Sequence, residues 1–282
     1  MRHAVLGAGG VGGLIAAALA RTGNPVTLIV RDAAHPRKLK VESAKLGDFD
    51  VTVDVATRLL KPVDVLWVTT KATQLEAALP SAPAAFAEGG VAVPLLNGID
   101  HVARLRELYR RVTPGTIRVE TEKTQAGHIV QLLPFIGVEL AGPLAAEIAA
   151  ELTAAGIDAK VKEDELTMLW SKLVMLAPLA LTTASTMRTL GGVRDDPRWR
   201  ERLLDVMGEA VEVARGLGAR VDLEATRGRL LAAPDSMRSS MQKDRELGRP
   251  LEVDAIGGPI VRAGRELGVP TPQTAILMSA LG

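Results

Sequence analysis

The first 31 residues, MRHAVLGAGGVGGLIAAALARTGNPVTLIVR (1–31), decide the fold of the N-terminal half. An apolar run ends at a glycine-rich turn, residues 7–12, and strong helix formers follow at residues 14–20. Gly23 stands where a helix-ending glycine is expected, and the β-branched run 26–30 indicates a second buried strand. This order of strand, helix and strand predicts the first unit of a parallel, doubly wound sheet.

The glycine-rich turn has the spacing GxGxxG of a dinucleotide-binding turn. Its glycines permit a tight turn, close approach of the backbone to a pyrophosphate, and close packing of helix on strand. The pyrophosphate would lie at the helix N-terminus, where free N–H groups and the helix dipole favour an anion. A purely structural turn is the alternative, but the strand before it and the helix after it favour a cofactor site. The expected cofactor-binding residues of the turn are Gly7, Ala8, Gly9, Gly10, Val11 and Gly12.

The residue that closes the second strand bears on the choice of cofactor. An acidic residue there accepts a hydrogen bond from the ribose 2′-hydroxyl of NAD, whereas an arginine suits the 2′-phosphate of NADP. Arg31 holds this position and favours NADP(H). Asp32 would serve NAD if the strand ended one residue later, and a solvated loop pair is the third alternative.

Further strand patterns place two polar residues beside the turn. Apolar runs predict strands at residues 50–55, 63–69 and 91–96, and Lys71 and Asn97 follow the last two. The loops at the carboxyl ends of the strands line the ligand crevice of an open α/β sheet, so we expect both residues there. Taken singly, Lys71 also fits a solvated loop charge, and Asn97 with its following glycine fits an ordinary turn.

The chain divides where the strand patterns stop, near Glu163. Three short strands before that point, near residues 117–120, 128–132 and 137–140, are expected to extend the sheet. Beyond it, apolar residues recur at helical spacing over residues 165–186, 197–217, 223–231 and 253–267. The sequence predicts an α/β fold with an NADP-binding Rossmann domain over 1–163 and an all-helical substrate and catalytic domain over 164–282.

Composition excludes several classes of function. The 282 residues carry 34 Lys and Arg against 33 Asp and Glu, and only 2% are aromatic, so nucleic acid is not an expected partner. There is no cysteine, the four histidines show no paired spacing, and no metal site is expected. No apolar run of about 20 residues is present to span a bilayer, and no signal peptide pattern occurs, so a cytoplasmic location is expected. The apolar segment 274–281 leaves a homodimer open.

Lys172 is the single charged residue between Met168 and Leu181. A lysine on an apolar helix can extend its ammonium to water. Burial would instead lower its pKa toward the range in which an ammonium donates a proton at neutral pH. Pro178 is expected to break or bend this helix six residues later.

The chain resembles the 2-dehydropantoate 2-reductase (ketopantoate reductase) family, within the 6-phosphogluconate dehydrogenase-like superfamily. The likeness covers nearly the full length. It rests on the glycine-rich turn with Arg31, on Thr70-Lys71, Asn97-Gly98 and Trp170 with Lys172-Leu173, and on a late stretch, Ser239-Ser240-Met241 through Asp244 to Glu252-Val253-Asp254 and Gly257. The late stretch is the most specific of these, although single residues of it also fit a helix, a turn and a helix start with acidic residues.

The resemblance implies NADPH-dependent reduction of a 2-oxo acid to a 2-hydroxy acid. Lys172 would protonate the forming alkoxide, and its charge would stabilise a negative charge that grows as hydride arrives. Asn97 would contact cofactor and substrate, Ser240 would bind substrate, Glu252 would position the substrate or the nicotinamide ribose, and Lys71 would approach the cofactor.

Three positions depart from the family pattern. Asparagines expected four and eight residues after Lys172, and just before Gly191, are Leu176, Ala180 and Leu190. A pocket without these amides should bind the hydroxyl of ketopantoate poorly, at roughly 1 kcal/mol per lost hydrogen bond. We therefore expect either ketopantoate or a more apolar 2-oxo acid as substrate, with the second favoured.

Two other functions stay open from the sequence. One is a different NAD(P) oxidoreductase of the superfamily, and the other is a non-catalytic regulator that senses NADP. The presence of Lys172 and Glu252 argues against the regulator, because a protein that only senses NADP does not need a proton donor. Glu120, Glu122 and Lys123 are charged residues that this fold could place near the nicotinamide.

Overall fold

The structure is a computed structural model that describes residues 1–84 and 86–282. The chain forms two compact units. The first comprises Met1–Leu96 and His101–Glu165, and the second comprises Asn97–Asp100 and Leu166–Gly282. The short segment Asn97–Asp100 thus belongs to the helical unit, although the sequence around it forms the sheet unit.

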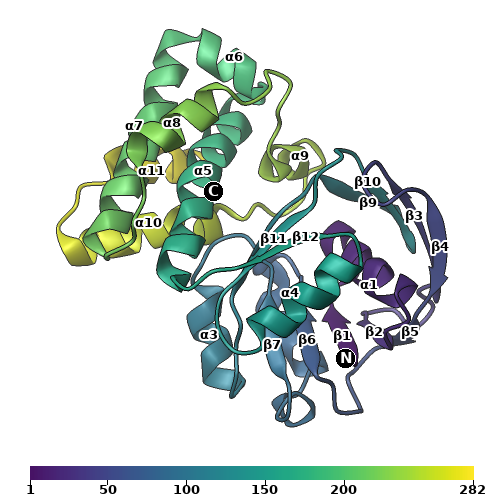
Figure 1. The fold of residues 1–282 in the computed structure, drawn as a ribbon. Coiled ribbons are helices and arrows are strands. Elements are labelled where there is room, and N and C mark those ends of the chain that lie inside the picture. Colours follow the sequence, from purple (N-terminus) through teal and green to yellow (C-terminus); the bar gives the residue numbers. More distant parts are fainter. The chain divides into compact units, whose positions relative to one another are not determined.

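The first unit contains a five-stranded parallel sheet (Figure 1). Its strands, in spatial order, are β5 (Asp54–Ala56), β2 (Val26–Ile29), β1 (His3–Leu6), β6 (Val65–Val68) and β7 (Val91–Pro94). All residues of the three strands β1, β6 and β7 are buried, which explains their continuous apolar runs. The expected Rossmann-type α/β fold is therefore confirmed.

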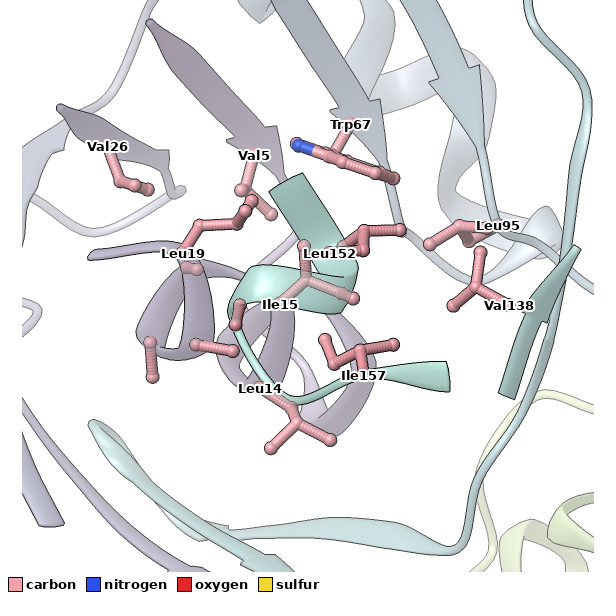
Figure 2. Packing of buried hydrophobic residues seen from close by; sticks show 14 of the residues in the cluster. Val5, Leu14, Ile15, Leu19, Val26, Trp67, Leu95, Val138, Leu152 and Ile157 are labelled. Atoms are coloured by element: carbon pink, nitrogen blue, oxygen red, sulfur yellow. The ribbon is translucent and has the colours of Figure 1, made fainter. Parts of the chain in front are cut away.

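Helix α1 (Gly10–Arg21) follows β1 and fills the space beside the sheet. Figure 2 shows Leu14, Ile15 and Leu19 of α1 in one buried cluster with Val5 of β1 and Trp67 of β6. Successive strand residues point to opposite faces, so their neighbours Leu6 and Leu66 lie in a second cluster. Both faces of the sheet are thus covered.

The second cluster is completed by short helices and by one longer helix. The short ones are η1 (Ala72–Gln74), α2 (Leu75–Ala78), η2 (Leu79–Ser81) and η3 (Ala84–Phe86), and the longer is α3 (His101–Leu108). Tyr109, directly after α3, donates its hydroxyl to the Ala82 carbonyl at 2.6 Å. Burial raises the pKa of Tyr109 to about 12.

The expectation that the later short strands extend the parallel sheet is wrong. They belong to two other sheets, one ordered β4-β3-β10-β9 and one ordered β12-β11-β8. Their bounds are β3 (Lys38–Ser43), β4 (Phe49–Thr52), β8 (Gly115–Arg118), β9 (Thr121–Gln125), β10 (His128–Gln131), β11 (Gly137–Leu140) and β12 (Asp158–Val161). The physical reason is a pairing between distant segments: β10 lies parallel to β3, and Ser43 pairs with Gln131 across 88 residues. Helix α4 (Ala145–Ala154) precedes β12.

The second unit is helical, as expected. Its helices are α5 (Glu165–Thr186), α6 (Leu190–Asp195), α7 (Pro197–Gly216), α8 (Leu223–Leu231), α9 (Ser240–Glu246), α10 (Val253–Leu267) and α11 (Pro272–Leu281). The predicted break at Pro178 is wrong, because α5 continues through it with Pro178 and its neighbour Ala177 buried in the unit. Helix α5 is long and apolar enough to pass a test for a membrane span, but 61% of the tested window is buried, as in a core helix.

Candidate active site and cofactor site

The glycine-rich turn is closed by contacts that exclude side chains at two positions. Gly7 has φ +110°, and a Cβ added there would lie 2.9 Å from the Thr70 amide nitrogen. A Cβ added to Gly12 would lie 1.9 Å from the Gly7 carbonyl oxygen. Thr69 donates its hydroxyl to that same oxygen at 2.8 Å, which links the turn to the end of β6.

Gly9 faces open space instead, since a Cβ added there would meet no atom within 4 Å. It is the N-cap of α1, no side chain caps the helix, and no acidic residue lies in its first turn. The first N–H groups of an α-helix have no acceptor within the helix and attract anions. The turn therefore fits the pyrophosphate of a dinucleotide, with Gly7 and Gly12 shaping it and Gly9 leaving room.

Arg31 and Lys71 lie at the same edge of the sheet as this turn. The register pairs Leu6 with Ile29 on one side and with Val68 on the other, so the three parallel strands end together. Arg31 is exposed just after β2. The Asp32 carboxylate accepts the Ala34 N–H at 2.9 Å and so serves its own turn. This arrangement favours Arg31 over Asp32 as the residue that meets the cofactor's 2′ position.

The charged group that precedes and enters β9 also lies beside the turn. Gly10 approaches Thr121 so closely that a Cβ on Gly10 would lie 2.9 Å from the Thr121 carbonyl oxygen. Glu120 is half-buried, whereas Glu122 and Lys123 are exposed. The structure thus places Thr121, the residue between Glu120 and Glu122, against the glycine-rich turn.

In the helical unit, three residues that the sequence singles out converge. The Lys172 ammonium donates to the Asn97 side-chain oxygen at 3.3 Å. The Asn97 amide nitrogen donates to the Glu252 carboxylate at 3.1 Å. An ammonium can only donate and a carboxylate can only accept, so the two neighbours fix which way the Asn97 amide points. Lys172, Asn97 and Glu252 form a hydrogen-bonded row, which we call the Lys-Asn-Glu row.

Each member of the Lys-Asn-Glu row is held by a different element. Lys172 is half-buried in α5, next to the buried residues Leu173 and Val174. Glu252 is the N-cap residue of α10 and is 2% exposed. A buried carboxylate needs hydrogen-bond donors, and the Asn97 amide supplies one. Asn97 comes from the segment after β7, and it is 75 residues from Lys172 and 155 from Glu252 in the sequence.

The two serines at the start of α9 differ in burial and in their contacts. Ser239 is 3% exposed, accepts the Gln242 N–H at 3.0 Å as the helix cap, and contacts the Thr183 hydroxyl at 2.7 Å. Ser240 is the exposed first residue of the helix. The structure therefore gives Ser239 a structural function and leaves the Ser240 side chain on the surface of the unit, without placing it in the Lys-Asn-Glu row.

The three positions that lack the family's asparagines are apolar in environment as well as in sequence. Ala180 and Leu190 are fully buried in the core of the helical unit. Leu176 packs against that core and is half-buried, one helical turn after Lys172. None of the three side chains can hydrogen-bond a substrate, so α5 is apolar at the positions four and eight residues after Lys172.

One polar cluster near Asn97 escaped the sequence analysis. Arg262 binds the carboxylates of Asp100 and Asp254 at 2.5 and 2.7 Å. All three are exposed charged residues, and only Asp254 lies in a stretch that the sequence singles out. Asp100 and Arg262 belong to no recognisable motif and are 162 residues apart. The signal that was available is the glycine at position 258, midway between Asp254 and Arg262 on one helix. Among the described residues, no cluster of His, Cys, Asp and Glu suits a metal ion.

A parallel sheet with a glycine-rich turn and a helical unit with a lysine, an amide and a carboxylate define a dinucleotide-dependent oxidoreductase. Residues 3–135 match the family model described as ketopantoate reductase PanE/ApbA, and residues 164–282 match the model of its C-terminal part. A 2-dehydropantoate 2-reductase of Caulobacter vibrioides is 32% identical over 292 residues, covering 99% of this chain and 97% of the relative. The chain belongs to the ketopantoate reductase PanE/ApbA family, and the resemblance seen in the sequence is confirmed.

Solved structures agree with this assignment. A PanE/ApbA-family ketopantoate reductase from Ralstonia eutropha JMP134 has a TM-score of 0.91 at 27% identity, covering 100% of this chain and 97% of that chain. A D-mandelate dehydrogenase, solved with NADH and anilino(oxo)acetate, has a TM-score of 0.89 at 20% identity over 100% of this chain and 97% of that one. The second likeness concerns the fold alone.

Proposed function

We propose that this protein reduces a 2-oxo acid to the 2-hydroxy acid with NADPH. The observation that carries the proposal is the Lys-Asn-Glu row, in which a half-buried ammonium is oriented by an amide that a buried carboxylate fixes. A protein that only binds a nucleotide has no need for such a proton donor. Family membership points to the same chemistry, since curated relatives carry the name 2-dehydropantoate 2-reductase.

Lys172 is the proposed proton donor. NADPH, when bound, supplies the hydride that converts the keto carbon to a secondary alcohol. The Lys172 ammonium donates a proton to the oxygen of that carbon, where negative charge grows during the reduction. Because this charge is small in the ground state, the interaction strengthens in the transition state and raises kcat.

Asn97 and Glu252 are proposed to orient this proton donor and the ligands around it. The Asn97 oxygen accepts one ammonium N–H and so fixes the direction of the other two. Glu252 holds the Asn97 amide and is proposed to contact the substrate or the nicotinamide ribose. Ser240 is proposed to bind the substrate from the start of α9.

The cofactor is proposed to bind along the carboxyl ends of β1, β2 and β6. The residues Gly7, Ala8, Gly9, Gly10, Val11 and Gly12 would hold the pyrophosphate at the N-terminus of α1. The Arg31 guanidinium would pair with the 2′-phosphate, and Lys71 would approach the cofactor from the loop after β6. We propose that residues 1–163 bind the cofactor and that residues 164–282 bind substrate and carry the catalytic lysine.

The proposed substrate is a 2-oxo acid with an apolar side chain, because Leu176, Ala180 and Leu190 offer no hydrogen bonds. The occurrence of this fold in a D-mandelate dehydrogenase is compatible with such a substrate. A homodimer also stays a prediction, which sedimentation velocity would test directly.

A matched pair of substrates tests the proposal. Ketopantoate and 3,3-dimethyl-2-oxobutanoate differ by a single hydroxyl group, so their kcat/KM values with NADPH report what the enzyme gains from that hydroxyl. We expect turnover of both, with the deoxy compound at least equal to ketopantoate. A clear preference for ketopantoate would overturn the apolar substrate class, and bound NADPH that is never oxidised by any 2-oxo acid would overturn the reductase.

A further inference from the structure

Arg262 joins the segment that carries Asn97 to helix α10. Its guanidinium donates to Asp100 at 2.5 Å and to Asp254 at 2.7 Å. Asp100 lies three residues after Asn97, whereas Asp254 and Arg262 both belong to α10. All of these residues are in the helical unit. Arg262 is therefore a bridge between α10 and the four-residue segment Asn97–Asp100.

The bridge depends on a glycine beneath it. Asp254, Gly258 and Arg262 follow one another at intervals of four on the same face of α10, and about 12 Å separates the first from the last along the helix axis. The Arg262 side chain folds back over Gly258 to reach Asp254. A Cβ at Gly258 would lie 2.5 Å from an Asp254 carboxylate oxygen and closer still to the guanidinium. The absence of a side chain at position 258 makes the path possible.

Two further contacts hold the same segment against the helical unit. Gly98 has φ +81°, and its Cα lies so near the Ala255 carbonyl oxygen that a Cβ would overlap it. Ile99 packs against the hydrophobic core of the unit. Asn97, Gly98, Ile99 and Asp100 each therefore have a separate anchor within the unit.

We propose that Arg262, with Asp100 and Asp254, is a positioning group that holds the Asn97 amide in place between Lys172 and Glu252. The segment is short, so a shift at Asp100 is passed to Asn97 through three peptide bonds of constrained geometry. Gly98 and Ile99 limit movement toward and away from α10, and the Arg262 bridge limits movement along it. The proposal deepens the proposed function, because the Lys-Asn-Glu row is the part of the site that it positions.

The three charged side chains contribute little to the stability of the fold. Arg262 is 48% exposed, Asp100 54% and Asp254 77%, and exposed ion pairs add little to the free energy of unfolding. The loss of Arg262 should therefore leave the unit folded and change geometry at Asn97. A displacement of about 1 Å in a catalytic group can lower the rate as much as a hundredfold.

Kinetics of Arg262→Ala test the positioning function. We expect kcat on a 2-oxo acid to fall about tenfold or more, with a nearly unchanged KM for NADPH. Arg262→Lys should recover part of the loss, because it keeps the charge but not the forked guanidinium. Arg188→Ala is the matched control, since Arg188 is also exposed in this unit and pairs with Asp196 at 3.0 Å. The control should keep the wild-type kcat.

A double-mutant cycle shows whether Arg262 acts through Asn97. If it does, Arg262→Ala lowers kcat in the wild-type background and has almost no further effect in Asn97→Ala. Equal effects of Arg262→Ala in both backgrounds, or an unchanged kcat in the single variant, would overturn the proposal.

A spectroscopic measurement separates this proposal from the proposed function. The chain contains only two asparagines, Asn24 and Asn97, so the protein labelled with ¹⁵N-asparagine gives two side-chain NH₂ pairs. Arg262→Ala should shift the Asn97 pair, which Glu252→Gln assigns, and leave the Asn24 pair in place. An unmoved Asn97 pair would refute the positioning group even in an active enzyme. A shifted pair in a protein that reduces no 2-oxo acid would support the positioning group while the proposed reaction failed.

Discussion

Substitution by alanine should lower the unfolding midpoint at Gly12 but the affinity for the cofactor at Gly9. A Cβ added to Gly12 would lie 1.9 Å from the Gly7 carbonyl oxygen and 2.3 Å from the Thr69 hydroxyl. Ordinary contact begins near 3.4 Å, so the turn must open by about 1.5 Å. A backbone oxygen cannot rotate away, and overpacking of this kind costs about 1–3 kcal/mol. For a chain of this size the unfolding midpoint of Gly12→Ala should fall by roughly 3–10 °C.

Gly9→Ala should instead fold almost normally and bind the cofactor poorly. The new methyl group meets no protein atom within 4 Å, and alanine in place of glycine at an N-cap costs about 1 kcal/mol or less. The methyl group would, however, occupy the space that we assign to the pyrophosphate. We expect the Kd for NADPH to rise at least tenfold, while the midpoint stays within about 3 °C of wild type.

Differential scanning fluorimetry and titration of NADPH fluorescence measure both quantities on the same samples. Gly228→Ala is a useful comparison, because position 228 also has open space around it but lies in α8 of the helical unit. It should leave the Kd for NADPH unchanged. A wild-type midpoint for Gly12→Ala would show that the turn tolerates a side chain at position 12. A wild-type Kd for NADPH in Gly9→Ala would show that the pyrophosphate does not lie against position 9.

Three more predictions concern cofactor choice, acid stability and substrate choice. Arg31→Ala should raise the KM for NADPH and leave that for NADH nearly unchanged, as measured by initial rates, because only NADPH carries the 2′-phosphate. Burial lowers the pKa of His3 more than the Glu151 carboxylate raises it, so His3 has a lower pKa in the folded than in the unfolded protein. As the pH falls, the unfolded chain therefore takes up the proton at a higher pH than the folded protein does. The free energy of unfolding should be at its full value above about pH 6.5 and decrease below it. Melting curves from pH 7.5 to 5.0 should show a smaller decrease in His3→Gln. Leu176→Asn should raise the ratio of kcat/KM for ketopantoate to kcat/KM for its deoxy analogue by roughly fivefold, the equivalent of one hydrogen bond. An unchanged ratio would show that Leu176 does not contact the substrate side chain.

The local sequence pattern was sufficient for four strands of the parallel sheet and for several long helices. The predicted strand 50–55 is instead divided between β4 and β5, which belong to two different sheets. Residues 1–31 contain a complete strand, helix and strand, with glycines between the first strand and the helix and just after the helix. The helical spacing of apolar residues after residue 163 likewise predicts α5, α7, α8 and α10, but not α6, α9 and α11. These features depend on neighbours in the sequence, so no knowledge of the fold was required.

Long-range pairing was not predictable in the same way. Strands β3 and β9 were missed, and β8, β10 and β11 were placed in the wrong sheet, because their partners are set by contacts between distant segments. Pro178 was expected to break α5, but burial of the surrounding helix outweighs the local preference of a proline. Local propensity gives way to packing at such positions.

In the candidate site, too, the residues could be predicted from the sequence but their long-range contacts could not. The residue types of Lys172, Asn97 and Glu252 could be singled out from the sequence, but their hydrogen bonds join segments 75 and 155 residues apart. The Arg262 bridge could not be found, since Arg262 and Asp100 are exposed charged residues with no pattern of their own, although Asp254 lies in the late stretch of the resemblance. Only the glycine at position 258 hints at a side chain that must pass over it.

Lys172 is proposed to supply the proton in a reduction by NADPH. The most direct test is the rate of NADPH oxidation in a single turnover with 3,3-dimethyl-2-oxobutanoate, for wild type and Lys172→Ala, with the Kd for NADPH measured on both. We expect the variant to bind NADPH as wild type does and to oxidise it at least a hundredfold more slowly. Oxidation at the wild-type rate by Lys172→Ala would contradict this proposal.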